Sequence, residues 1–341
     1  MSALLEIRDL VVRFSGDRTV HAINGVSLRV AKGEVLALLG ESGSGKSVTL
    51  KSMMQLLPGR RTYIGGQISF DGRDVLALRG RALADFRGRE VAMIFQDPSL
   101  ALDPVYSIGT QIAETVMRHE GISRDAARRR ALDMLERVRI PSPERRLDNY
   151  PHEMSGGMRQ RAMIALALAC GPRLLLADEP TTALDATVQM QVLLLLRELQ
   201  QEMGMSVIFV THDIGVAVEI ADRVAVMYAG TIVETGTIAQ IIKDPRHPYT
   251  RGLLAANLHG AVKGSRLEAI PGAPPTLEEP PRACPFAPRC PVAIPVCSTM
   301  RPPLSALGPG RAVACILETE AGHSGRGAPN GAGAGTAGTH A

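Results

Sequence analysis

The chain has 341 residues, of which 45% are hydrophobic, and a formal net charge of +4. This length allows one large domain with an appendage, and the apolar content is sufficient for a buried core. Trp is absent and aromatic residues make up only 3% of the chain, so nothing favours nucleic-acid recognition by base stacking. No apolar stretch reaches the roughly 18–20 residues of a membrane span, and the N-terminus lacks the pattern of a signal peptide. We therefore expect a cytoplasmic chain that contacts a membrane only through partners.

The first part of the chain, up to about residue 250, alternates short β-rich runs with helical patterns. This alternation predicts an α/β domain built on a mixed or parallel sheet. Residues 11–14 and 26–30 are expected to form early antiparallel strands. The continuous apolar runs at residues 35–39, 174–177 and 207–210 are typical of strands that are buried on both faces.

A helical insert is expected within this core. Residues 108–139 have a helical pattern in which Gly121 stops one helix and Ser123 caps the next. After about residue 260 the composition becomes rich in Pro and Cys, and the last residues are a Gly/Ala low-complexity tail. The predicted division is a domain at 1–260 with a helical subdomain at about 100–170, a small Pro/Cys-rich C-terminal module at 261–318 and a disordered tail at 319–341.

Residues 40–47 read GESGSGKS and match the phosphate-loop pattern G-x-x-x-x-G-K-S/T. The segment follows a predicted buried strand and precedes a helical run, as the motif requires. Its glycines let backbone N–H groups converge on phosphate oxygens, and the helix N-terminus adds a positive dipole. Lys46 supplies a charge to the β- and γ-phosphates, and Ser47 offers its hydroxyl to Mg²⁺. The predicted ATP-binding residues here are Gly40, Ser42, Gly43, Ser44, Gly45, Lys46, Ser47 and Val48.

An acidic pair follows the predicted strand at 174–177. Asp178 and Glu179 cannot be core filler, because burying an unpaired charge is too costly. Asp178 is placed to bind ATP through a hydrated Mg²⁺, and Glu179 is the candidate base that polarises the attacking water. An acidic pair that caps a helix is the alternative interpretation.

Four further segments resemble motifs of ABC ATPases, and their order along the chain is that of an ABC nucleotide-binding domain. The matching residues are Gln96 (Q-loop), Ser155, Gly156 and Gly157 (signature), Asp185 within 183–185 (D-loop) and His212 (switch histidine). The resemblance covers about residues 4–245. It implies a P-loop NTPase core with an antiparallel β subdomain and a helical subdomain.

The resemblance also implies roles for single residues. Two cassettes would pair head to tail, so that each signature motif contacts the γ-phosphate held by the other cassette. The implied catalytic residues are Glu179, His212 and Gln96, and the implied Mg²⁺ ligands are Ser47, Gln96 and Asp178. Phe14 lies where the family has the ring that stacks on adenine, although a core Phe is the alternative interpretation. Met158 departs from the usual Gln of the signature motif, so no role is carried over to it.

The segments RHPYTRGLLAA (246–256) and CPFAPRCP (284–291) are similar to the C-terminal extension of oligopeptide/dipeptide importer ATPases. Residues 4–317 then resemble the D-type ATPase subunit of such an importer, which takes up peptides or similar small solutes. The implied partners are two membrane-spanning permease subunits, a second ATPase subunit or a second copy of this chain, and an extracytoplasmic solute-binding protein; nucleic acid is not among them. The implied location is peripheral, on the cytoplasmic face of the inner membrane.

Four cysteines, Cys284, Cys290, Cys297 and Cys315, lie in the Pro-rich segment. Disulfides are disfavoured in a cytoplasmic protein, and the gaps between these cysteines are longer than those of a usual zinc knuckle. Structural zinc and unliganded thiols remain alternatives. Four thiolates suit a 4Fe–4S cluster, and the family resemblance implies one at these positions.

The main competing function is a soluble ABC ATPase that acts on nucleic acid or ribosomes. Such proteins usually fuse two cassettes or insert a long coiled coil, and exporters commonly fuse the ATPase to its membrane spans; the sequence shows neither pattern. A regulatory ATP-binding module without turnover is opposed by the presence of both Glu179 and His212. We therefore expect an ATP-hydrolysing transport subunit that binds ATP and Mg²⁺.

Overall fold

The structure is a computed structural model, and it describes residues 3–182, 184–258 and 270–318. The strands are β1 (Ala3–Ser15), β2 (Thr19–Ala31), β3 (Val35–Leu39), β4 (Thr62–Phe70), β5 (Arg73–Asp74), β6 (Val91–Ile94), β7 (Leu174–Asp178), β8 (Ser206–Thr211), β9 (Arg223–Tyr228), β10 (Thr231–Thr237), β11 (Ser305–Gly308) and β12 (Arg311–Val313). The helices are α1 (Lys46–Met53), α2 (Gly80–Asp85), α3 (Pro98–Ala101), α4 (Ile108–Glu120), α5 (Arg124–Arg137), α6 (Pro143–Arg146), α7 (Gly156–Leu168), α8 (Ala186–Met203), α9 (Ile214–Ile220), α10 (Ile238–Lys243) and α11 (Pro248–Leu258).

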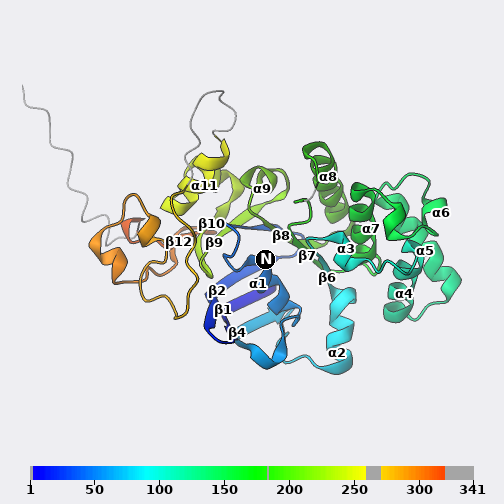
Figure 1. Ribbon diagram of the computed structural model, residues 1–341, viewed down its shortest axis with the longest axis horizontal. Coiled ribbons are helices and arrows are strands. Elements are labelled where there is room, and N and C mark those ends of the chain that lie inside the picture. The colour runs from blue at the N-terminus through cyan, green and yellow to red at the C-terminus, as the bar shows by residue number, and fades with distance from the viewer. Residues whose placement is uncertain (1–2, 183, 259–269, 319–341) are drawn as a thin grey trace, which may run out of the picture.

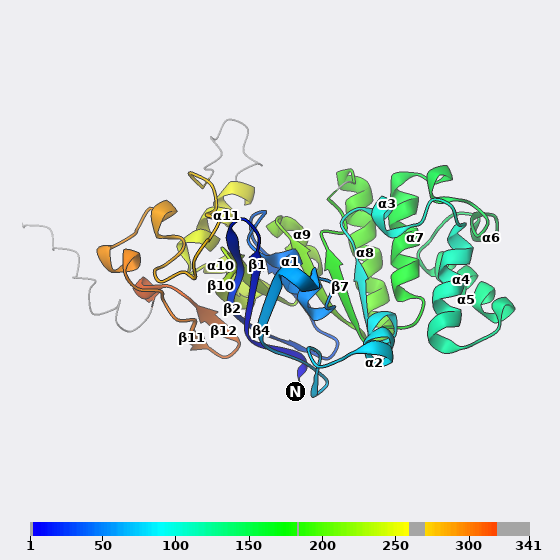
Figure 2. The same ribbon diagram turned by 60° about the horizontal axis from the view of Figure 1, so that its bottom comes forward.

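Two sheets organise the chain. The larger has the order β11-β12-β10-β9-β3-β8-β7-β6, and its strands from β9 to β6 run parallel. The smaller is antiparallel, with the order β2-β1-β4-β5. Figures 1 and 2 show the helices α4 to α7 grouped at one end of the molecule and residues 270–318 at the other. The predicted core, antiparallel subdomain and helical subdomain are all present.

The sequence of the central strand β3 is continuously apolar because both faces of the strand are buried. Val35, Ala37 and Leu39 belong to one core cluster, whereas Leu36 and Leu38 belong to a second one under the antiparallel sheet. Successive side chains of a strand point to opposite faces, so a strand that is covered on both sides has no polar position. The prediction of a doubly buried strand at 35–39 is confirmed.

The predicted helix boundaries between 108 and 139 are also confirmed. Gly121 ends α4 with a φ of 68°, a left-handed conformation that glycine adopts without a steric penalty. The hydroxyl of Ser123 accepts a hydrogen bond from the backbone N–H of Ala126 and so caps α5. The early strands were located correctly, but β1 and β2 each extend over 13 residues.

The C-terminal region contributes a hairpin of two strands, β11 and β12. Strand β12 pairs antiparallel with β10, through Glu234 opposite Val313 and Thr235 opposite Ala312. A hairpin of this region therefore extends the central sheet, and the boundary near residue 260 stays a prediction. The predicted tail at 319–341 lies outside the described residues. Within the described part of the chain, no helix is long and apolar enough to cross a membrane.

Candidate functional site

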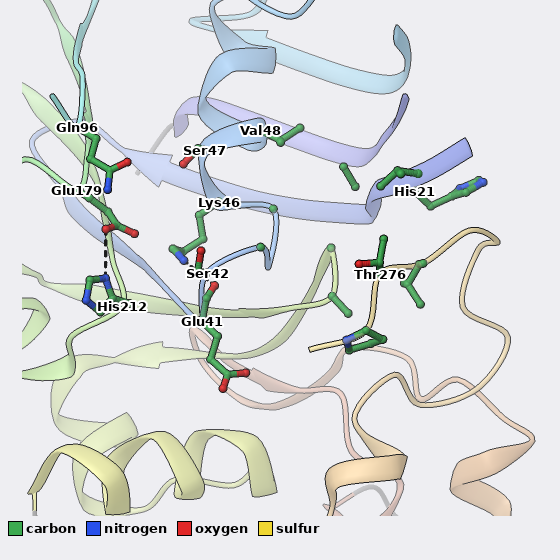
Figure 3. Close-up of a pocket in the computed structure, with 18 residues that line it drawn as sticks. His21, Glu41, Ser42, Lys46, Ser47, Val48, Gln96, Glu179, His212 and Thr276 are labelled. Atoms are coloured by element: carbon green, nitrogen blue, oxygen red, sulfur yellow. Dashed lines mark hydrogen bonds and ion pairs between the residues drawn. The ribbon is translucent and has the colours of Figure 1, made fainter. Parts of the chain in front are cut away.

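A cavity of about 690 Å³ opens where β3 ends and α1 begins. Figure 3 shows the side chains that surround it. Its walls come from β2, the segment 41–48, the turn between β9 and β10, three single residues (Gln96, Glu179 and His212), and residues 275–277. The predicted loop residues Ser42, Gly43, Gly45, Lys46, Ser47 and Val48 all line it. Gly40 and Ser44 belong to the same loop but are not among the lining residues, and Ser44 is only 1% exposed.

The loop requires glycine because it lies against other backbone. A Cβ added to Gly45, whose φ is 102°, would lie 2.7 Å from the carbonyl oxygen of Ala22 and 2.9 Å from Cε of Met227. A Cβ on Gly40 would lie 2.2 Å from the carbonyl oxygen of Met227. Neither position can accept a side chain, and the first backbone N–H groups of α1, which follows directly, have no acceptor within the helix. This is a cradle for an anion.

Lys46 places a positive charge in this cradle. Its Nζ donates to the carbonyl oxygens of Gly40 and Glu41, at 2.7 and 2.8 Å, and the residue is only 4% exposed. Burial lowers the pKa of Lys46, and the carboxylates of Glu179, Asp178 and Glu41 act in the opposite direction. A phosphate beside the amine would favour the charged form further.

Ser47 and Asp178 bring a hydroxyl and a carboxylate together. Oγ of Ser47 donates to Oδ1 of Asp178 at 2.7 Å. Burial raises the pKa of Asp178, and the hydrogen bond from Ser47 acts in the opposite direction. Oxygen donors of this kind are those that Mg²⁺ prefers, so the residues present fit the predicted ion.

Glu179 and His212 form the second polar pair. Nδ1 of His212 lies 3.2 Å from Oε2 of Glu179, and the same carboxylate oxygen accepts a hydrogen bond from Oγ1 of Thr182 at 3.0 Å. Glu179 has a φ of 46°, a left-handed conformation that turns the chain sharply after β7. The carboxylate is thereby held in the cavity by two side chains. Gln96 stands beside this pair in Figure 3.

The signature residues lie at the N-terminus of α7, outside this cavity. Ser155 caps α7 by accepting a hydrogen bond from the backbone N–H of Met158, and neither Ser155 nor Gly156 or Gly157 lines the cavity of its own chain. Asp185 likewise caps α8, by accepting from Val188 N–H at 3.0 Å. Ala183 of the predicted D-loop lies outside the described residues. Both motifs begin helices at the surface, so their predicted contact with a second nucleotide stays a prediction.

Phe14 is not among the residues that line the cavity. It pairs with Val20 of β2 and Thr62 of β4, and its side chain packs against the core cluster of the antiparallel sheet. This placement agrees with the alternative of a core Phe, and stacking on adenine stays a prediction.

Sequence reasoning missed the residues at the opposite end of the cavity. Val20, His21 and Ala22 of β2 line this end together with residues 275–277. No short motif marks either segment, because they meet only when the C-terminal region folds back onto β2. Glu41 could have indicated a contact of this kind from the sequence alone. An acidic side chain in a loop that binds anionic phosphates requires a cationic partner.

The four cysteines line one narrow cavity of about 20 Å³ next to Phe286. Burial raises the pKa of Cys284 and Cys290, and it raises the pKa of Cys315 to about 11. Thiols that bind no metal pack in such a place as small apolar groups. Among the described residues no three Cys, His, Asp or Glu side chains form a group that could hold a metal ion. The predicted 4Fe–4S cluster is therefore not supported.

The parts of this site define a class of protein. A strand, a glycine loop and a helix are followed by an acidic pair at the end of a neighbouring strand, with a histidine after the next one. An antiparallel sheet and a helical subdomain, in which the signature residues lie at the exposed N-terminus of α7, complete the arrangement. This is the nucleotide-binding domain of an ATP-binding cassette protein.

Comparisons with known proteins agree with this class. Residues 23–182 match the ABC transporter family, and residues 233–297 match the family described as oligopeptide/dipeptide transporter, C-terminal region. The dimeric bacterial ABC transporter cassette MJ0796 is 28% identical, with a TM-score of 0.61 over 69% of this chain and 98% of that chain. The cassette cbiO1 from Clostridium perfringens is 27% identical, with a TM-score of 0.62 over 72% and 92%.

Proteins with similar sequences show which kind of ATP-binding cassette protein this is. The probable peptide ABC transporter ATP-binding protein y4tR of Sinorhizobium fredii is 52% identical over 93% of this chain and 96% of its own length. The oligopeptide transport ATP-binding protein OppD of Bacillus subtilis is 50% identical over 89% and 86%. The dipeptide transport ATP-binding protein DppD of the same organism is 46% identical over 94% and 96%. The chain belongs to the family of oligopeptide/dipeptide ABC transporter ATP-binding proteins, which are ATPases coupled to transport.

Proposed function

We propose that this chain hydrolyses ATP to energise the uptake of peptides or similar small solutes across the cytoplasmic membrane. The observation that carries the proposal is that Lys46, Ser47 and the Glu179–His212 pair line one cavity, while Asp178 accepts a hydrogen bond from Ser47 behind the cavity wall. The names of the relatives, which transport oligopeptides and dipeptides, support the class of solute.

Each side chain of the site has its own role in the proposed hydrolysis of ATP. The loop backbone and Lys46 hold the phosphates, and Mg²⁺ held by Ser47, Asp178 and Gln96 would neutralise part of the phosphate charge. Glu179 polarises a water, whose oxygen attacks the γ-phosphorus while the bond to the β–γ bridging oxygen breaks. The products are ADP and inorganic phosphate. His212 holds the carboxylate of Glu179 in place and faces the γ-phosphate side, so it acts on both the base and the developing charge.

We further propose that a second cassette completes each site. Ser155, Gly156 and Gly157 form an exposed helix N-terminus that cannot contribute to the cavity of their own chain. Such an N-terminus suits the γ-phosphate of a nucleotide on another chain. The partner cassette is a second ATPase subunit or another copy of this chain.

The remaining proposed partners are two permease subunits in the membrane and an extracytoplasmic solute-binding protein. In this assembly the chain is a peripheral subunit at the cytoplasmic face of the inner membrane. Its own contribution is ATP turnover, and the solute is chosen by the permeases and the binding protein.

Uptake in cells tests the whole proposal. Cells that lack the gene should fail to accumulate labelled di- or oligopeptides, and the wild-type chain should restore uptake. A Glu179→Gln chain should not restore it, whereas Glu219→Gln, a change at an exposed position outside the cavity, should. Restoration of uptake by Glu179→Gln would contradict the proposal.

A further inference from the structure

The cavity has two chemically different ends. Gln96, Glu179 and His212 stand at one end in Figure 3, His21 and Thr276 stand at the other, and Lys46 lies between them. The first end carries acidic, imidazole and amide groups. The second end is walled by the aliphatic groups of Val20 and Leu277, and Thr276 offers it a hydroxyl.

If the chain has the proposed function, the difference between the two ends determines the orientation of bound ATP in the cavity. Water attack requires the γ-phosphate to lie beside Glu179, and Lys46 contacts the β- and γ-phosphates. The phosphate chain therefore runs from Lys46 toward Glu179. The nucleoside must extend the opposite way, toward His21 and residues 275–277.

Residues 275–277 are held in this position by contacts at both sides. The backbone N–H of His21 donates to the carbonyl oxygen of Leu277 at 2.8 Å, which ties the segment to β2. The side chain of Leu277 is partly buried and packs against the main core cluster. The wall is thus built from two segments that are remote in sequence.

We propose that residues 275–277 of the C-terminal region, together with β2, form the binding wall for the nucleoside of ATP. Apolar groups of Pro275 and Leu277 face the flat, largely apolar base, and the Thr276 hydroxyl is available to a polar atom of the base or ribose. The region that extends the cassette therefore contributes directly to nucleotide binding and to selection among nucleoside triphosphates.

Two ligands separate the ends of the site in a binding experiment. Mg-ATP spans the whole cavity, whereas inorganic triphosphate has no nucleoside and contacts only the phosphate end. Leu277→Ala and Thr276→Ala should each weaken binding of Mg-ATP by about three- to tenfold, as expected for the loss of one apolar or polar contact. Binding of inorganic triphosphate should be unchanged. The matched control is Leu307→Ala, at an exposed position on β11 away from the cavity, which should leave both affinities unchanged.

The outcomes distinguish this inference from the proposed function. Wild-type protein that binds neither ligand would overturn both. Wild-type binding that Leu277→Ala and Thr276→Ala leave unchanged would overturn only the inference. Because Leu277 also packs on the core, photolabelling of the unaltered chain provides a second measurement. An adenine-azido analogue of ATP should label the tryptic peptide that contains Thr276, with protection by unlabelled ATP; protected labelling confined to other peptides would overturn the inference.

Discussion

Arg289 and Glu41 form a two-point ion pair that joins the C-terminal region to the phosphate loop. Nη1 and Nη2 of Arg289 lie 2.7 and 3.0 Å from Oε2 and Oε1 of Glu41. The side chain of Arg289 is 6% exposed and also donates to the carbonyl oxygens of Pro271, Ile270 and Gly272. On the other side of Glu41, its backbone N–H donates to the hydroxyl oxygen of Tyr249 at 2.8 Å. The second residue of the loop is therefore fixed from both directions.

Arg289→Ala should weaken Mg-ATP binding by at least about tenfold. Arg289 is buried and Glu41 is 27% exposed, so removal of the guanidinium leaves a partly desolvated carboxylate without its counter-charge. The stranded Glu41 carboxylate would then repel phosphate. The measurement is titration with a fluorescent ATP analogue, with thermal unfolding recorded in parallel.

The matched control for Arg289 is Arg18→Ala. Arg18 also pairs with the C-terminal region, through Glu278, but its side chain is 79% exposed, and exposed pairs contribute only about 0–1 kcal/mol. Its removal should leave ATP affinity within about twofold of wild type. If Arg289→Ala lowered ATP affinity no more than Arg18→Ala does, the phosphate loop would not depend on Arg289.

His212→Ala should lower kcat by at least about a hundredfold while changing ATP affinity much less. Nδ1 of His212 contacts the Glu179 carboxylate. In the proposed mechanism, loss of the imidazole therefore removes orientation of the base and a group that faces the transferred phosphoryl. Steady-state ATPase assays and equilibrium binding separate the two quantities. His152→Ala, at an exposed position outside the cavity, is the control, and a wild-type kcat for His212→Ala would remove the residue from the mechanism.

Gly156→Glu should abolish ATP-dependent dimer formation without unfolding the chain. A Cβ at Gly156 would meet nothing within 4 Å, so the monomer can accept the side chain. A carboxylate at this helix N-terminus would nevertheless repel the γ-phosphate of a partner cassette. In a Glu179→Gln background that traps ATP, size-exclusion chromatography should show dimers, and the added Gly156→Glu should return the protein to monomers. Dimers that persist would argue against the shared site.

The stability of the protein should fall as pH decreases below about 6.5, in part because of His247. Burial lowers the pKa of His247 to about 3, while in the unfolded chain it is about 6.5. Between these values the unfolded state binds more protons than the folded state, so stability is present above pH 6.5 and is lost progressively as pH falls toward 3.

His247→Asn removes this titration and keeps an acceptor for the backbone N–H of Tyr249, which donates to His247 Nδ1 at 3.0 Å. The slope of unfolding free energy against pH, measured in denaturant between pH 4 and 6, should therefore decrease by about 1.4 kcal/mol per pH unit. His152→Asn, at an exposed position, should retain the wild-type slope. A slope unchanged in His247→Asn would mean that other groups carry the acid sensitivity.

The sequence was sufficient to predict the phosphate end of the site because its determinants are local. Gly40 to Ser47 are consecutive, and the strand before them and the helix after them are marked by their own apolar patterns. The same holds for the helix boundaries at Gly121 and Ser123, where one residue sets the backbone conformation or the cap.

The nucleoside end could not be predicted in this way, since it depends on contacts between distant segments. Arg289 and Glu41 are 248 residues apart in the sequence, and the hydrogen bond between His21 and Leu277 also crosses most of the chain. Phe14 shows a related dependence on tertiary packing: its ring packs against the core cluster of the antiparallel sheet and does not line the cavity, and its stacking on adenine stays a prediction.

The pairing of β12 with β10 has a consequence for truncated forms of the chain. Without the hairpin of β11 and β12, the row of N–H and C=O groups along β10 that now faces β12 would become a free sheet edge. Free edges of apolar strands recruit strands from other molecules, and Ile232 and Val233 of β10 are apolar and buried. A chain cut after the cassette would therefore retain its phosphate loop but would tend to aggregate. By pairing with β10, the hairpin prevents this aggregation.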